Sequence, residues 1–226
     1  MRRLLFEPLP WVALLLLVAS SASAQEPVKA DRLFEAVKAK NISAVKDALD
    51  KGAEVNAKDR SGRTPLLVAA EYSKIPEIVS LLLAKGAEIE ARDKYGWTPL
   101  MLAAMFSSTP EIVSLLLEKG AEIEARGNAG LTPLMLAAEN SSTPEIVSLL
   151  LEKGAEIDAR DNDGWTPLMF AAQFSSTPEI VSLLLDAGAD PLAKDKDGKK
   201  AIDYAKENVK LKGTKAYWKL HDKSFE

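Results

Sequence analysis

Apolar blocks alternate with short polar stretches along most of the chain, and the polar positions have helical spacing. Within residues 111–118, polar Glu111, Ser114 and Glu118 fall at i, i+3 and i+7, and the other five positions are apolar. This spacing predicts a helix with one narrow solvent-facing stripe. The preceding apolar block, residues 100–106, carries no charge at all, which predicts a helix that neighbouring elements mostly cover.

Helix-capping residues mark where these helices begin and end. Thr98 followed by Pro99 is a favourable N-cap with proline at the first helical position. Thr109 followed by Pro110 predicts a second helix begun by the same cap chemistry. Gly120 predicts a left-handed stop just past that helix, and the polar residues after it lead into a turn. One unit therefore predicts a helix pair followed by a projecting turn.

The same pattern recurs every 34 residues, and its punctuation keeps that period. Two columns of five glycines and two columns of four prolines share the spacing, namely Gly52, Gly86, Gly120, Gly154 and Gly188; Gly62, Gly96, Gly130, Gly164 and Gly198; Pro65, Pro99, Pro133 and Pro167; and Pro76, Pro110, Pro144 and Pro178. A fixed period of this length is typical of a repeat array, in which each unit covers the apolar sides of its neighbour.

The units follow from the periodic columns. We expect an N-terminal capping repeat, four full repeats and a C-terminal cap, at residues 31–63, 64–97, 98–131, 132–165, 166–199 and 200–226. The last unit lacks the Thr-Pro-Leu start and the Lys-Gly-Ala stop, and it predicts two short helices that close the far end of the stack.

Residues 1–24 predict a secretory signal peptide. Arg2 and Arg3 precede a nine-residue apolar core at residues 11–19, and Ala22-Ser23-Ala24 has the small residues of a cleavage site. An uncleaved membrane anchor is the alternative, but a span needs about 20 apolar residues, and Glu7, Pro8 and Pro10 interrupt this one. We expect Sec-type export with cleavage after Ala24, a short linker at residues 25–30, and a periplasmic or secreted protein.

Composition excludes several classes of function. The chain is mildly acidic, with a formal net charge of −4, so it lacks the basic surface expected of a nucleic-acid binder or of a protein held on anionic lipid. Its cysteine count of 0 excludes disulfides. After signal cleavage we expect a monomer that binds no membrane, no nucleic acid and no cofactor.

The ordered motifs identify a family resemblance. TPL, AA, EIVSLLL, KGAEI and a D-x-x-G turn follow one another in fixed order over about residues 31–226, and the chain thereby resembles an ankyrin-repeat protein. The resemblance implies an all-α solenoid of stacked helix pairs with projecting β-turn fingers, with first helices on the concave side and second helices on the convex side. Two features depart from the family: the period is 34 residues, and the usual histidine after TPL is replaced by Leu67, Met101, Met135 and Met169.

Catalytic and metal-binding residues are scarce. The single histidine, His221, lies near the end of the terminal cap, so neither a His/Cys metal site nor Cys–His catalysis can be built, and we expect a surface histidine. The stretches 161–164 and 195–198 resemble the middle of a calcium loop. The other ligand positions hold residues such as Ala159 and Phe170, which favours finger-tip turns. We expect a protein that is not an enzyme and holds no metal.

Differences between copies point to a binding face. Residues 98–131 and 132–165 differ at six of 34 positions, which are Met105/Glu139, Phe106/Asn140, Glu124/Asp158, Gly127/Asp161, Ala129/Asp163 and Leu131/Trp165. Five of the six lie at the end of the first helix or in the finger, and these places share one face in the family's geometry.

Aromatic side chains occupy this face, and aromatics are common anchors of binding surfaces. The candidate partner-binding residues are Tyr72, Tyr95, Trp97, Phe106, Trp165 and Phe174. The alternative for the tryptophans and phenylalanines is that they fold back as packing for the next repeat. The sequence therefore favours a non-enzymatic module that binds a protein partner on its concave, finger-bearing face. A passive envelope spacer without a dedicated partner, or a secreted effector acting on a host or competitor protein, stays open.

Overall fold

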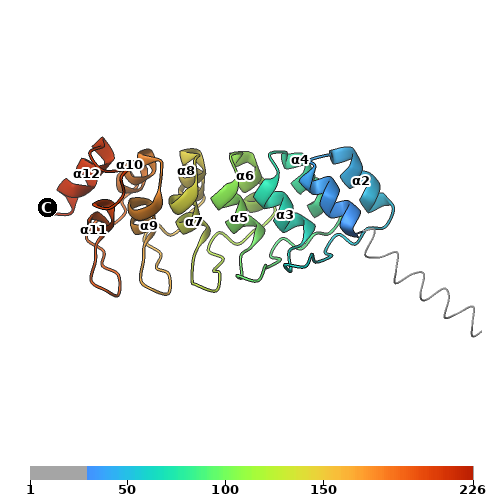
Figure 1. Ribbon diagram of the computed structural model, residues 1–226, viewed down its shortest axis with the longest axis horizontal. Coiled ribbons are helices and arrows are strands. Elements are labelled where there is room, and N and C mark those ends of the chain that lie inside the picture. Colours follow the sequence, from blue (N-terminus) through green and yellow to red (C-terminus); the bar gives the residue numbers. More distant parts are fainter. Residues whose placement is uncertain (1–29, 226) are drawn as a thin grey trace, which may run out of the picture.

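A computed structural model describes residues 30–225, and the expected signal peptide at residues 1–24 lies outside them. In the described part of the chain, helices and turns form one elongated stack, without strands (Figure 1). A first helix covers residues 30–38. The others are α2 (Ile42–Asp50), α3 (Pro65–Tyr72), α4 (Pro76–Ala84), α5 (Pro99–Phe106), α6 (Pro110–Glu118), α7 (Pro133–Asn140), α8 (Pro144–Glu152), α9 (Pro167–Phe174), α10 (Pro178–Asp186), α11 (Ala201–Ala205) and α12 (Lys215–Lys223).

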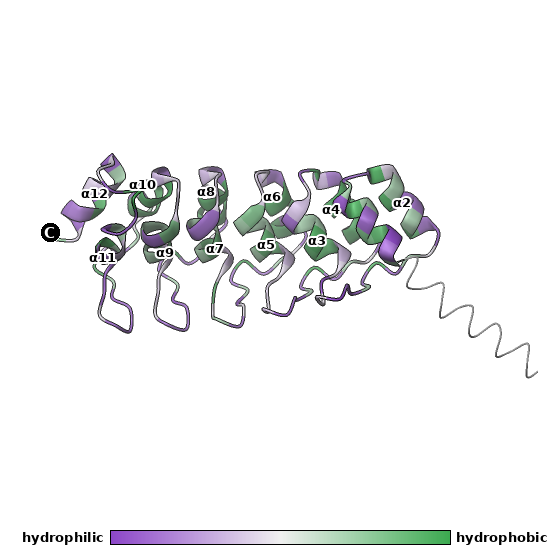
Figure 2. Ribbon diagram, in the orientation of Figure 1, coloured by the Kyte–Doolittle hydropathy of each residue, from purple (hydrophilic) through white to green (hydrophobic). Residues whose placement is uncertain are grey.

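The helices stand in two rows, and the all-α solenoid predicted from the repeats is confirmed. Helices α3, α5, α7, α9 and α11 form one row in which each helix contacts the next. Helices α4, α6, α8, α10 and α12 form the second row. A loop projects below the first row in each repeat (Figure 1). Figure 2 shows the apolar residues concentrated in the helices and the polar residues in these loops and the outer turns.

The first row of helices is the most fully buried part of the molecule. In α5 the side chains of Leu100, Met101, Ala103 and Ala104 are all 0% exposed, as expected for a helix without charge. The two small alanines let the neighbouring helices approach closely, so the apolar core runs continuously from one repeat to the next.

Thr98 begins α5 as expected, because its hydroxyl accepts a hydrogen bond from the Met101 N–H. Lys119 then ends α6, and Gly120 follows with a positive φ of 94°. Only glycine adopts this backbone conformation at little cost. The predicted helix stop is therefore confirmed.

The second helix does not begin with the side-chain cap that the Thr109-Pro110 pair predicts. Thr109 precedes α6, but its side chain makes no capping hydrogen bond. Instead the buried Ser107 hydroxyl accepts a hydrogen bond from the Thr109 N–H (3.0 Å) and donates one to the Thr109 carbonyl (3.1 Å). The short link between the helices is thus held by a serine at its beginning, and Pro110 occupies the first position of α6.

The C-terminal helices pack across the end of the stack. Helix α11 contacts α9, and α12 contacts α10 and α11. Ile202, Tyr204 and Leu220 are buried there, whereas Trp218 is 53% exposed and takes little part in closing the core. His221 is half-exposed beside Tyr217 and Phe225.

Candidate functional site

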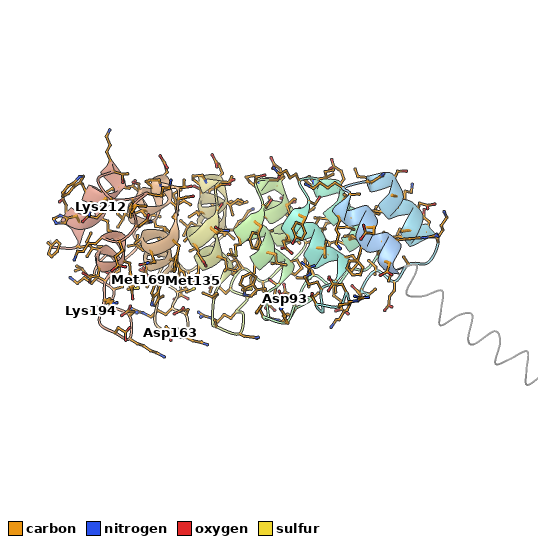
Figure 3. The ribbon with its side chains drawn as sticks, in the orientation of Figure 1. Asp93, Met135, Asp163, Met169, Lys194 and Lys212 are labelled. Atoms are coloured by element: carbon orange, nitrogen blue, oxygen red, sulfur yellow. The ribbon has the colours of Figure 1, made fainter. Side chains whose placement is uncertain are left out.

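The five projecting loops, called fingers below, share one backbone turn. They comprise residues 59–63, 93–97, 127–131, 161–165 and 195–199, and in each the first N–H donates to the carbonyl of the fifth residue. At Asp93 the carboxylate also accepts the N–H groups of Tyr95 (2.8 Å) and Trp97 (2.9 Å). Figure 3 shows Asp93, Asp163 and Lys194 along this edge of the molecule.

Asp161 shows the same chemistry in the stretch that resembled a calcium loop. Its carboxylate accepts the N–H groups of Asp163 (2.9 Å) and Trp165 (2.7 Å). The carboxylate oxygen therefore serves the backbone of its own turn, as the finger-tip interpretation predicts.

Three arginines align the fingers, and sequence reasoning missed them. Arg92 donates both to the Gly96 carbonyl of its own finger (2.9 Å) and to the Arg126 carbonyl of the next repeat (2.7 Å). Arg126 and Arg160 repeat the arrangement. The 34-residue spacing of these arginines was visible in the sequence, but only the fold shows that each one joins two repeats.

The six candidate aromatics separate into two groups. Four are well exposed, with fractional exposures of 43–54%, namely Tyr72, Tyr95, Phe106 and Phe174. Trp97 and Trp165 are half-buried and pack against the core. This differs from the expectation of projecting tryptophans, and the two rings follow the alternative of packing toward the next repeat.

Trp97 lies over the next finger at Gly127. A Cβ atom added to Gly127 would lie 2.9 Å from Cδ1 of Trp97 and 3.1 Å from Cε of Met101. Any other residue at this position would displace the rigid indole ring. The difference between Gly127 and Asp161 in the two copies therefore has a packing cause. With glycine here, this finger has no carboxylate to accept its N–H groups.

Trp165 does not pack over a finger as Trp97 does. It packs against aromatic rings on helices. Its ring centroid lies 4.2 Å from that of Tyr204 on α11, 5.2 Å from that of Phe170 and 6.0 Å from that of Phe174. The Tyr204 hydroxyl donates to the carboxylate of Asp195 in the last finger. Burial and this carboxylate raise the pKa of Tyr204. The cluster joins the last finger to α11.

A second register position on this face differs in chemistry from repeat to repeat. It is the penultimate residue of each first helix and holds Glu71, Met105, Glu139 and Gln173. The Arg63 guanidinium pairs with Glu71 (2.9 Å) and Asp59 (3.1 Å). At Glu139, burial alone raises the pKa of the carboxyl.

Comparison with known proteins agrees with this architecture. A family profile described as ankyrin repeats (3 copies) matches residues 33–127 and 123–195, which is more than half of the chain. The chain belongs to the ankyrin-repeat family. Ankyrin repeats suggest a protein–protein interaction module, and proteins of this family are typically non-enzymatic scaffolds.

A curated relative resembles part of this ankyrin-repeat chain. Zygote-specific protein 3 of Chlamydomonas reinhardtii is 47% identical over 74 residues, which cover 32% of this chain and 20% of that protein. The similarity thus extends over about a fifth of the relative.

The family's histidine position is apolar here, as the sequence showed. Leu67, Met101, Met135 and Met169 are all 0% exposed. The Thr132 N–H points at the Met135 sulfur at 3.4 Å. None of the helices between residues 30 and 225 has the length and apolar character that crossing a membrane requires.

Proposed function

We propose that this ankyrin-repeat chain is an exported, monomeric, non-enzymatic module that binds a protein partner on its concave, finger-bearing face. The observation that carries the proposal is the exposure of four aromatic side chains on this face. Tyr72, Phe106 and Phe174 are the last residues of α3, α5 and α9, and Tyr95 lies in a finger. Exposed aromatics gathered on one face are typical of binding surfaces.

Trp97 and Trp165 act beneath these residues rather than as projecting anchors. Trp165 stacks on Phe174 with an interplanar angle of 20°, and Trp97 lies 5.9 Å from the Tyr95 ring, measured between centroids. A ring supported by another ring loses less conformational freedom when a partner docks. The tryptophans therefore support two of the four exposed aromatics, Tyr95 and Phe174.

Photocrosslinking in the producing cells tests this surface. Benzoylphenylalanine at Phe106 should yield one discrete crosslinked protein, because this side chain lies on the proposed face. The matched control places it at Glu111, which is exposed on α6 in the second row, and should yield none. No product from Phe106 or from the other exposed aromatics would favour a passive spacer, and a product from Glu111 alone would assign binding to the other face.

Export is proposed from residues 1–24 alone, with their arginine pair, apolar core and Ala22-Ser23-Ala24 site. Mass spectrometry of the protein from its own host should find Gln25 at the N-terminus. A mature protein that retains Arg2 would contradict export. Cell fractionation then separates a periplasmic protein from a released effector.

A further inference from the structure

The third full repeat carries an acidic residue whose counterpart in an earlier repeat has an internal partner. Glu139 is the penultimate residue of α7, and Glu71 occupies the same position of α3, two repeats earlier. The two glutamates differ in what the preceding finger places beside them.

Arg63 supplies the counterion in the earlier repeat. It is the last residue of its finger, and its guanidinium donates to Glu71 (2.9 Å) and through Nε to Asp59 (3.2 Å). The side chains of Arg63 and Glu71 are only 24% and 17% exposed. The last position of a finger and the penultimate position of the helix that follows it therefore meet.

Leu131 and Gly127 hold the corresponding positions beside Glu139. Leucine replaces the arginine and packs with Met101 and Leu136 in an apolar cluster that also includes Met105. Within residues 30–225, the half-buried Glu139 carboxylate takes part in no hydrogen bond or ion pair. Burial raises its pKa, because a partly desolvated carboxylate without a counterion is disfavoured.

The helices on both sides of α7 end in exposed aromatic residues. Helix α7 lies between α5 and α9, and these two helices end in Phe106 and Phe174, which are 43% and 51% exposed. A cation bound at Glu139 would therefore lie on a helix whose two neighbours end in exposed aromatic side chains. Guanidinium suits this setting, because it is planar, pairs with carboxylates through two donors, stacks on aromatic faces and is less strongly hydrated than ammonium.

We propose that Glu139 binds an arginine side chain of the partner. The guanidinium of that arginine would pair with Glu139 as the guanidinium of Arg63 pairs with Glu71. The proposal rests on the proposed function, because it names the chemistry of a partner docked on the finger-bearing face. The protein thus supplies the cation for Glu71 from its own finger, and the partner supplies the cation for Glu139.

The test uses a phage-displayed library of random peptides selected on the purified protein. Selected peptides are kept when substitution of both Phe106 and Phe174 by serine abolishes their binding, because these peptides occupy the proposed face. The kept peptides should share an arginine. Replacing that arginine by citrulline, which has nearly the same shape but no charge, should weaken binding at least about tenfold, as expected for a charge-assisted hydrogen bond.

Three variants locate the arginine on the protein. Glu139→Gln should weaken binding at least about tenfold. Leu131→Arg should do the same, because the finger then supplies the cation as Arg63 does. The matched control Glu71→Gln changes the acid that already has an internal partner and should leave the affinity unchanged.

The outcomes separate the two proposals. Peptides that need Phe106 and Phe174 but bind equally well to Glu139→Gln, or that share no arginine, would overturn the arginine site and leave the docking face in place. A selection in which no peptide depends on Phe106 and Phe174 would overturn the docking face itself.

Discussion

Two fingers end in tryptophan, and the two rings are accommodated differently. Trp97 lies over the neighbouring finger, where Gly127 leaves room for the indole. Trp165 faces a finger that begins with Asp195, and its ring instead packs on Tyr204, Phe170 and Phe174. A tryptophan at the end of this turn is thus accommodated by a glycine in one finger, Gly127 beside Trp97, and by a tyrosine in the other, Tyr204 beside Trp165.

The two tryptophans indicate that differences between copies are coupled in pairs of residues that lie close together in the fold. Trp97 is matched to Gly127, and Arg63 is matched to Glu71. Some of the variation among copies therefore has a packing cause, separate from the binding that we propose. These two pairs do not account for the exposed aromatics or for Glu139, which has no counterion within residues 30–225.

The largest expected effect comes from removing the cap on which Trp165 packs. Deletion of residues 200–226 removes Tyr204 and uncovers α9 and α10, so the protein should aggregate. Deletion of residues 132–165 removes one internal repeat and should leave a shorter folded protein. Circular dichroism and light scattering measure both, and equal behaviour of the two deletions would show that the last unit is not a cap.

Tyr204→Phe keeps the aromatic contact with Trp165 and removes only the hydroxyl. The Asp195 carboxylate then loses a buried hydrogen-bond donor. We expect the free energy of unfolding to fall by about 1–3 kcal/mol, measured by urea denaturation. Tyr217→Phe on α12 is the control and should change it by less than about 0.5 kcal/mol. If both variants lost the same free energy of unfolding, the hydrogen bond from Tyr204 to Asp195 would not stabilise the protein.

A smaller effect is expected in the finger between the two tryptophans, where Leu131 leaves Glu139 without a cation. Because burial raises the folded-state pKa of Glu139, the stability gained from its protonated form is present below about pH 4, the ordinary range of glutamic acid, and is lost as the pH rises through the folded-state pKa. Glu139→Gln should therefore stabilise the protein at pH 7, with a gap that closes toward about pH 4.

Urea unfolding at the two pH values measures this gap. In a Leu131→Arg background the introduced guanidinium compensates the carboxylate, so Glu139→Gln should no longer stabilise. A gap that is independent of pH, or that persists in the Leu131→Arg background, would contradict the assigned cause.

Much of the fold was predictable because local and periodic signals agree. Thr98 and Pro99 fix a helix start and Gly120 fixes a helix end, and both depend only on neighbouring backbone. The Ser107 link was not predicted, because a Thr-Pro pair resembles a side-chain cap whether or not the hydroxyl is used.

The candidate site was predictable only in part. Repeats in register show which positions share a face, and this located the exposed Tyr72, Tyr95, Phe106 and Phe174. The direction of each tryptophan ring was not predictable, because it depends on residues about 30 or more positions later, such as Gly127 and Tyr204. Such dependence becomes visible only when neighbouring repeats are placed side by side.

A double-mutant cycle on Trp97 and Gly127 measures whether differences between copies are coupled in pairs. The quantity measured is the free energy of unfolding in urea. Gly127→Ala should cost about 1–3 kcal/mol in the presence of Trp97, because its Cβ displaces the indole. After Trp97→Leu, which restores the residue found at Leu131, the same change should be neutral or stabilising by up to about 1 kcal/mol. An equal cost of Gly127→Ala in both backgrounds would show that the two positions are not coupled.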